Sequence, residues 1–112
     1  RVIIDLAVPY TSDVDAVQEG MLAAAVEMWD SPEWHARILE KPEIWGIESI
    51  SAEALVVRLV IKTRTSVKDD VARDLRLRLK RALDILGVEL PPLNSIVMNP
   101  TPTLVKGPKV AP

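Results

Sequence analysis

The sequence contains no cysteine, no phenylalanine and a single histidine among its 112 residues. Without cysteine, a disulfide framework, a thiolate metal site and a cysteine nucleophile are all excluded. No apolar run approaches the roughly 20 residues that a membrane-spanning helix requires. Because aromatic residues make up only 4% of the chain and apolar residues 48%, we expect a core of aliphatic side chains and methionine.

The sequence also has no large excess of positive or negative residues. The 14 Lys and Arg residues nearly balance the 16 Asp and Glu residues, which leaves a formal net charge of −2. Such a chain sets up no broad positive field, so nucleic acid is not an expected partner. The glycine-rich phosphate loop and the HExxH, CxxC and GxSxG motifs are absent as well. We therefore expect no enzyme activity, no cofactor and no resident metal.

Two periods of apolar residues alternate along the chain, whose length fits one domain. A period of two, or a short apolar run, predicts strands over residues 2–8, 43–50, 55–62 and 95–98. A helical period predicts helices over 14–30 and from about 67 to 86. Between Ser31 and Pro42 we expect only a short helical turn.

This βαββαβ order predicts an α+β fold. Two helices on one face of a four-stranded antiparallel sheet, the ferredoxin-like sandwich, would bury both apolar helix stripes within residues 1–98. The second helix is expected to bury Val71, Leu75, Leu79, Ala82 and Leu86 and to stop before Gly87. Residues 99–112 contain four prolines and are predicted to be a flexible or partner-docked tail. Because the chain opens at Arg1 and enters a strand at once, we expect it to be a piece of a longer protein.

A small acidic cluster, Asp13 and Asp15, follows Thr11 and Ser12 at the start of the first helix. We interpret it as a helix start, with Ser12 as the capping residue and the two carboxylates near the positive end of the helix dipole. Ser66, followed by Asp69, is expected to repeat this scheme at the second helix. A divalent-ion loop would need more oxygen ligands and usually a glycine, so metal binding is the weaker interpretation.

The aromatic residues and the histidine receive structural interpretations. His35 has no nucleophile at a suitable spacing and is expected at the solvent edge of a surface connection, next to Trp34. Trp29, Trp34 and Trp45 could form an aromatic ligand platform. In a chain without phenylalanine they are better explained as the large fillers of the core and its rim.

A basic ridge, which we define as Arg73, Arg76 and Lys80, lies along one predicted face of the second helix. Such a row of cations is usually a solvated surface. It is nevertheless the most distinctive charge feature of the sequence and the candidate for a solute-filter site.

Three stretches resemble the carboxy-terminal cytoplasmic domain of the small-conductance mechanosensitive channel family. They read "VPYTSDVDAV", "DSPEWHARILEKPEIWGIESI" and "LVVRLVIKTRTSVKDDVARDLRLRLKRALDILGVELP", and the likeness spans about residues 2–92. Its most telling positions are Val8-Pro9-Tyr10, Ser12 to Asp15, Pro42, Gly46-Ile47, Arg58, Lys62 and Lys80 to Pro91. After the proline at position 91, many relatives continue with an aromatic residue, whereas this chain has Pro92-Leu93. Its last fourteen residues match no family pattern.

The resemblance implies a membrane channel with a pore, a middle β domain and this domain. Seven copies would form a homo-oligomer whose hollow cytoplasmic cage has side openings. Membrane tension would open the pore and release ions and small osmolytes after hypo-osmotic shock, while this domain contributes assembly and solute filtering. The full-length protein would then lie in the cell membrane, with this domain on the cytoplasmic side.

Other classes of function fit the same fold. A regulatory domain of ferredoxin-like fold that senses a small molecule at a dimer interface is the main alternative. A protein-interaction module with a docking proline-rich tail is a third. The sequence before Arg1 discriminates them, because a pore and a β domain favour the channel whereas an enzyme domain favours the sensor.

Overall fold

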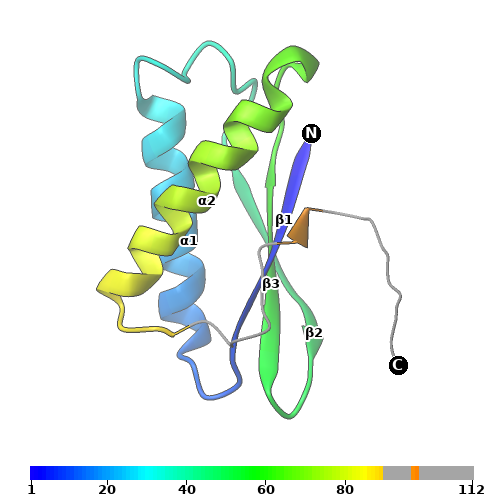
Figure 1. Ribbon diagram of the computed structural model, residues 1–112, viewed down its shortest axis with the longest axis vertical. Coiled ribbons are helices and arrows are strands. Elements are labelled where there is room, and N and C mark those ends of the chain that lie inside the picture. The colour runs from blue at the N-terminus through cyan, green and yellow to red at the C-terminus, as the bar shows by residue number, and fades with distance from the viewer. Residues whose placement is uncertain (90–96, 99–112) are drawn as a thin grey trace.

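The chain forms a layer of two helices packed on one face of an antiparallel sheet (Figure 1). The computed structural model describes residues 1–89 and 97–98. Its elements in chain order are β1 (Val2–Pro9), α1 (Val14–Asp30), β2 (Glu43–Ile50), β3 (Ala54–Ile61), the 3-10 turn η1 (Thr65–Val67), α2 (Lys68–Ile85) and β4 (Val97–Met98). The predicted α+β class, its two helices and its first three strands are confirmed, with bounds that differ by one or two residues.

The sheet is organised around β1, which lies between β3 and β4, while β2 forms the edge beyond β3. The β1–β3 ladder is antiparallel and runs without interruption from Val2 opposite Ile61 to Pro9 opposite Ala54. The β2–β3 ladder has irregularities on both sides of Ile47, and Gly46 there has a φ of 107°. Because only glycine adopts such a φ readily, it permits the bulge that twists this edge strand.

The fourth predicted strand is described in part. Val97 and Met98 pair with β1, opposite Asp5 and Ile4 respectively. Residues 95 and 96 of that predicted strand lie outside the described residues. The predicted tail, residues 99–112, also lies outside the described residues. The division of the chain into a domain, 1–98, and a tail, 99–112, therefore stays a prediction.

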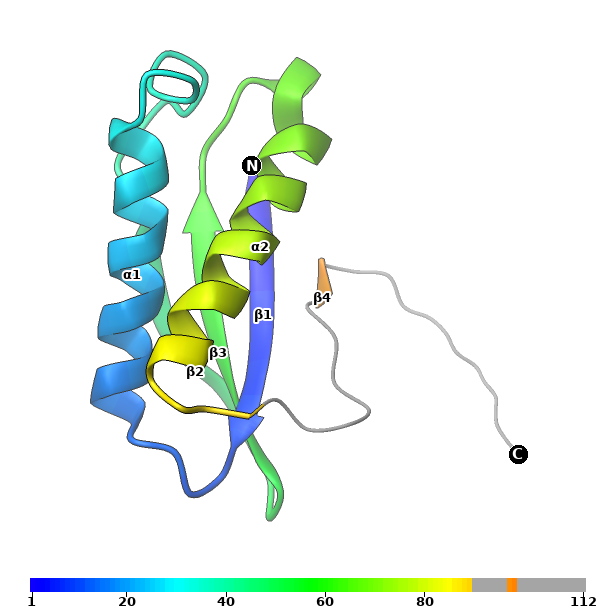
Figure 2. The ribbon, with the colours of Figure 1, turned by 60° about the vertical axis from the view of Figure 1, so that its left-hand side comes forward.

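The core fills the space between the sheet and the two helices (Figure 2). Every second residue of β1 points into it, and these four side chains are at most 1% exposed: Val2, Ile4, Leu6 and Val8. The helix residues that meet them are Val17, Met21, Ala25 and Met28 of α1 and Val71, Leu75, Leu79 and Leu83 of α2. Full burial of one such large aliphatic side chain stabilises the fold by about 1.5–3 kcal/mol. This apolar layer is therefore the main source of stability.

The start of α1 differs from the prediction by one residue. Asp13, not Ser12, is the capping residue, and its Oδ1 accepts a hydrogen bond from the Ala16 N–H at 3.1 Å. Ser12 lies one position too early to reach that amide, and its own N–H donates to the Pro9 carbonyl in the preceding turn at 2.9 Å. Asp15 lies in the first helical turn, where the helix dipole favours a carboxylate.

The predicted cap of α2 is wrong. Ser66 lies inside η1, and no side chain caps α2, which follows Val67 directly. Instead, the Lys68 N–H donates to the Thr65 carbonyl, so the 3-10 turn satisfies a backbone group that a capping side chain would otherwise serve. Asp69 and Asp70 lie in the first turn, as the helix dipole favours.

The end of α2 follows the prediction in one respect and departs from it in another. Gly87, with a φ of 75°, stops the helix, while the Val88 N–H donates back to the Leu83 carbonyl at 3.0 Å. The predicted core residue Leu86 is 43% exposed, so its assignment to the core is wrong. The reason is that Leu83, one turn earlier, takes the last buried position before the helix ends.

A two-armed ion pair spans the middle of the β1–β3 ladder. Arg58 Nε lies 2.7 Å from Asp5 Oδ1, and Arg58 Nη2 lies 2.8 Å from Asp5 Oδ2. Glu48 of β2 approaches the same guanidinium at 3.3 Å. The side chains of Asp5 and Arg58 are only 17% and 27% exposed, so solvent weakens this pair less than a surface pair.

The stability that the charged Arg58 guanidinium contributes does not change with pH near neutrality. The hydrogen bond from Asp5 raises the pKa of Arg58, the charges of Asp5 and Glu48 act in the same direction, and burial opposes them. A base whose folded pKa is raised contributes stability that is fully present below its unfolded pKa. Since that unfolded pKa is itself strongly alkaline, the contribution of Arg58 is lost only at very high pH.

The Asp13 cap gives a first prediction. Replacing Asp13 with Ala should lower the free energy of unfolding by about 1 kcal/mol, because the Ala16 amide loses its acceptor. Ser12→Ala is the matched control and should change it by less than about 0.5 kcal/mol. Urea denaturation followed by circular dichroism measures both. A larger loss in the Ser12 variant would contradict the assignment.

The Asp5–Arg58 pair gives a second prediction. Asp5→Asn should lower the free energy of unfolding by about 1–2 kcal/mol, since it leaves a partly buried guanidinium without its charged partner. Asp70→Asn removes the exposed pair with Arg73 and should cost only about 0.3 kcal/mol. A double-mutant cycle with Arg58→Gln measures the coupling energy. Equal losses in the Asp5 and Asp70 variants would show that the cross-strand pair has no special role.

Candidate functional site

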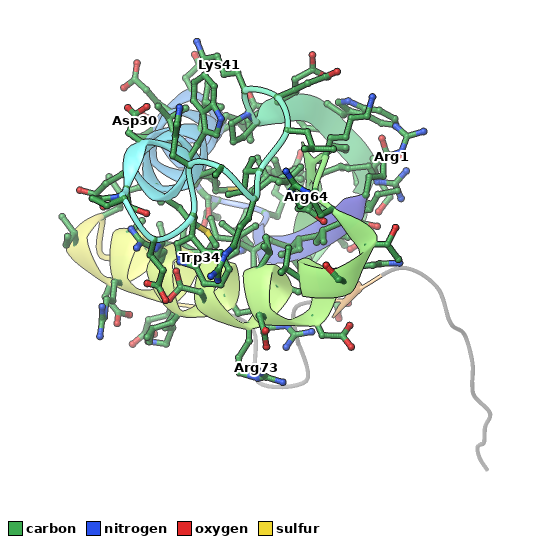
Figure 3. The ribbon with its side chains drawn as sticks, turned by 90° about the horizontal axis from the view of Figure 1, so that it is seen from above. Arg1, Asp30, Trp34, Lys41, Arg64 and Arg73 are labelled. Carbon is green, nitrogen blue, oxygen red and sulfur yellow. The ribbon has the colours of Figure 1, made fainter. Side chains whose placement is uncertain are left out.

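The basic ridge lies on α2 as the sequence predicts, but its charges are partly neutralised. Arg73 points away from the sheet (Figure 3), and its Nη1 lies 3.1 Å from Asp70 Oδ1. Lys80 Nζ lies 2.6 Å from Asp84 Oδ1. Over the whole of α2, six Lys and Arg residues face four Asp residues, which leaves a net charge of +2. The ridge is therefore weakly positive rather than a row of three bare cations.

The acidic cluster at the start of α1 acts in helix capping. Asp13 is committed to the Ala16 amide, and Asp15 is exposed to solvent. Within residues 1–89 and 97–98, no group of three or more His, Cys, Asp or Glu side chains is placed to hold a metal ion. The described geometry thus gives Asp13 a structural role and offers a cation no further ligands there.

The tryptophans occupy three different environments. Trp34 is 5% exposed and belongs to the core, at the end of the molecule where α1 stops and α2 starts (Figure 3). Trp29 packs against the core from its margin. Trp45 is 48% exposed on β2, with the Arg1 guanidinium 5.4 Å from its ring centre. This spread agrees with core and rim packing and gives no shared aromatic platform.

His35 lies at the surface, as expected, whereas its neighbour Trp34 belongs to the core. The His35 side chain is exposed, its Nδ1 lies 2.9 Å from the Trp29 carbonyl oxygen, and its ring lies 5.6 Å from that of Trp29. Trp34 turns inward, in agreement with its interpretation as a filler of the core or its rim, because residues 31–39 fold back over the end of the core and Ile38 pairs with Thr63. The Trp34 Nε1 donor is buried and has no hydrogen-bond partner in the part of the chain that the structure describes.

A groove between α1 and α2 was missed by the sequence analysis. It encloses about 540 Å³ on the outer side of the helix layer. Its apolar lining comes from α1 and from the end of α2: Gly20, Ala23, Ala24, Ala82, Ile85 and Leu86. Four charged residues lie at its rim: Glu27, Asp74, Arg78 and Arg81. Ile85 is 86% exposed, the highest value for any large apolar side chain in the described residues. The sequence did contain a signal for exposed apolar residues here. Leu83, Ile85 and Leu86 lie so close together in the chain that a helix cannot turn all three toward the core.

A second surface that the sequence analysis missed lies where β1 and the β2–β3 hairpin end. Ile50 and Tyr10 there are 62% and 54% exposed, second and third after Ile85 among the described residues. The Tyr10 N–H donates to the Glu53 carbonyl at 3.1 Å, which fixes Tyr10 beside the hairpin turn. Isolated exposed apolar residues are ordinary, but clusters of them mark interaction sites.

The described helices do not include one that is both long and apolar enough to cross a membrane. None of the curated proteins matches the chain. Among solved structures, 20 chains match, and one of them is the closed state of MscS from Helicobacter pylori, with a TM-score of 0.58 and 18% sequence identity. The match covers 96% of this chain and 40% of that one, so the present chain spans less than half of its relative's length. At this identity the likeness shows the fold alone.

Family membership rests on the sequence. Residues 2–90, which is 89 of the 112 residues, match the family described as "Mechanosensitive ion channel MscS, C-terminal". That match includes β1, both helices, β2 and β3. The family is a domain of ion channels and not a family of enzymes. The chain belongs to the MscS C-terminal domain family of mechanosensitive ion channels.

Proposed function

We propose that this chain is the cytoplasmic domain of a mechanosensitive channel that releases ions and small osmolytes on hypo-osmotic shock. The family match over residues 2–90 is the observation that carries the proposal, since it covers nearly all of the described fold. On this proposal the pore belongs to another part of the full-length protein, which lies in the cell membrane. The domain contributes assembly and solute filtering.

The proposed assembly is a ring of identical copies, seven in the full-length channel, that encloses a cage. The matching solved chain is a channel subunit of greater length, which supports a place for this domain beside further domains. The pairing of β4 with β1 supports a complete ferredoxin-like sandwich in each copy. The family match favours the channel over the small-molecule sensor, which shares only the fold.

We further propose the basic ridge as a weak solute filter. Its Arg73, Arg76 and Lys80 side chains would raise the local anion concentration if α2 faces a solute path, with a reach of about 8 Å at physiological salt. The ion pairs with Asp70 and Asp84 reduce that effect. The ridge should therefore tune selectivity modestly.

The channel function is tested in cells that lack other mechanosensitive channels. The full-length protein should restore survival of hypo-osmotic shock and give tension-activated currents in excised patches. A Leu75→Asp variant, which places a carboxylate at a fully buried position of α2, should lose protection because the domain no longer folds. Lys41→Ala, an exposed change, is the control. Absence of any tension-activated current from the full-length protein at normal expression would refute the proposal.

The filter role is tested by changing the ridge in both directions. Replacing Arg73, Arg76 and Lys80 with Glu should shift the reversal potential of the full-length channel toward cation preference, most strongly at low ionic strength. Asp70→Asn with Asp84→Asn releases two of these cations from their partners and should shift it the opposite way. The tension threshold should stay constant in both. Identical selectivity in all variants would return the ridge to an ordinary solvated surface.

A further inference from the structure

Two surfaces of the domain expose large apolar side chains to solvent. The first is the helix groove, defined by Gly20, Ala23, Ile85, Leu86 and the rim residue Arg81. The second is the hairpin end, defined by Tyr10, Ile50 and Glu53. These two surfaces carry the three most exposed large apolar side chains of the described residues. The first surface is a groove. The second lies at the turn of the β2–β3 hairpin, which extends past the ends of the helices (Figure 1).

The floor of the helix groove includes a glycine, Gly20. A Cβ atom at position 20 would lie 3.0 Å from Leu86 Cδ1, so Gly20 leaves room for the Leu86 side chain to lie against α1. A glycine inside a helix costs about 1 kcal/mol relative to alanine. The chain accepts that cost in the middle of α1, and the result is an apolar floor with Ile85 beside it, largely exposed to solvent.

The charges at the two surfaces are also complementary. Arg81 at the groove rim and Glu53 at the hairpin end are both exposed, and neither forms an ion pair within residues 1–89 and 97–98. Most other cations of α2 are engaged, for example Arg78 with Asp74 at 2.8 Å. Among the described residues, each apolar surface thus carries one charge without an ion-pair partner, and the two charges are opposite in sign.

The groove and the hairpin end of a single copy cannot meet. The groove is lined by residues of α1 and of the end of α2, whereas the hairpin belongs to the sheet, which forms the other layer of the fold (Figures 1 and 2). Contact between them therefore requires two copies that use different surfaces. Such a heterologous contact repeats from copy to copy and closes into a ring when the rotation between copies permits.

From these observations we infer that the occupant of the helix groove is a second copy of this chain. Tyr10 and Ile50 of one copy pack on Ile85 and Leu86 of the next, and Glu53 lies against Arg81. This inference rests on the homo-oligomer proposed above and adds which surfaces join its copies. Burial of the three exposed apolar side chains would provide the attraction, and the charge pair would fix the orientation.

Cysteine crosslinking in the full-length channel tests this contact, and the absence of native cysteine from these 112 residues makes it clean. Ile50→Cys and Ile85→Cys are introduced separately and together, with any cysteine elsewhere in the protein replaced by serine. With a short bis-maleimide reagent, each single variant should stay uncrosslinked, because identical positions do not meet. The double variant should give a ladder of covalent oligomers. Asp30→Cys with Ile85→Cys is the matched control pair and should give no ladder.

A charge exchange tests the orientation. Arg81→Glu alone and Glu53→Arg alone should each lower the crosslinking yield of the double-cysteine chain about fivefold, the scale of an exposed ion pair. The two changes together should restore it. Lys41→Glu, another exposed reversal of charge, should leave it unchanged.

Each contrary result has a distinct meaning. A full-length protein that is monomeric by light scattering in detergent would overturn the assembly and, with it, this contact. An intact oligomer without Ile50–Ile85 crosslinks would overturn the contact alone. Crosslinking of either single variant would show a two-fold contact instead. Crosslinking of Ile85→Cys to Val105→Cys within one chain, in place of Ile50→Cys, would assign the groove to the chain's own C-terminal segment.

Discussion

The eight-residue ladder between β1 and β3 is the constraint on which the rest of the domain depends. It places Val2, Ile4, Leu6 and Val8 on the helix side of the sheet, and a shift of one residue would turn all four toward the other face. The Asp5–Arg58 fork marks the correct register, because only this pairing sets the two charges directly opposite each other. With the register fixed, both helices have a continuous apolar surface to cover.

The same geometry leaves apolar side chains exposed where the helices and the sheet end. Helix α2 ends just before Gly87, where Ile85 and Leu86 line the groove beside α1 and stay exposed. The β2–β3 hairpin extends past the helices (Figure 1), with the exposed Ile50 next to its turn. A domain that acted alone would gain solubility from polar residues at these positions. Their apolar character is consistent with a domain that functions among other copies of itself.

The sequence predicted the element order because period two and helical period are local signals, and the glycine stop at Gly87 is local as well. It did not distinguish Ser12 from Asp13, since both side chains cap helices well and only the backbone path decides which one reaches Ala16. Trp34 was expected in the core or at its rim, but the choice between the two depends on residues 31–39 folding back over the core, which no local pattern indicates. The groove escaped prediction for the same reason: Gly20 and Leu86 meet only in the folded chain.

Electron cryomicroscopy of the full-length protein in lipid nanodiscs would show how the copies of this domain are arranged. We expect a cyclic assembly in which copies of this domain form a ring on one side of the membrane, each related to the next by the same rotation. We also expect one β1–β3 ladder with Asp5 opposite Arg58 in every copy. Copies of this domain that lie apart from one another, or that meet only as two-fold pairs, would contradict this arrangement.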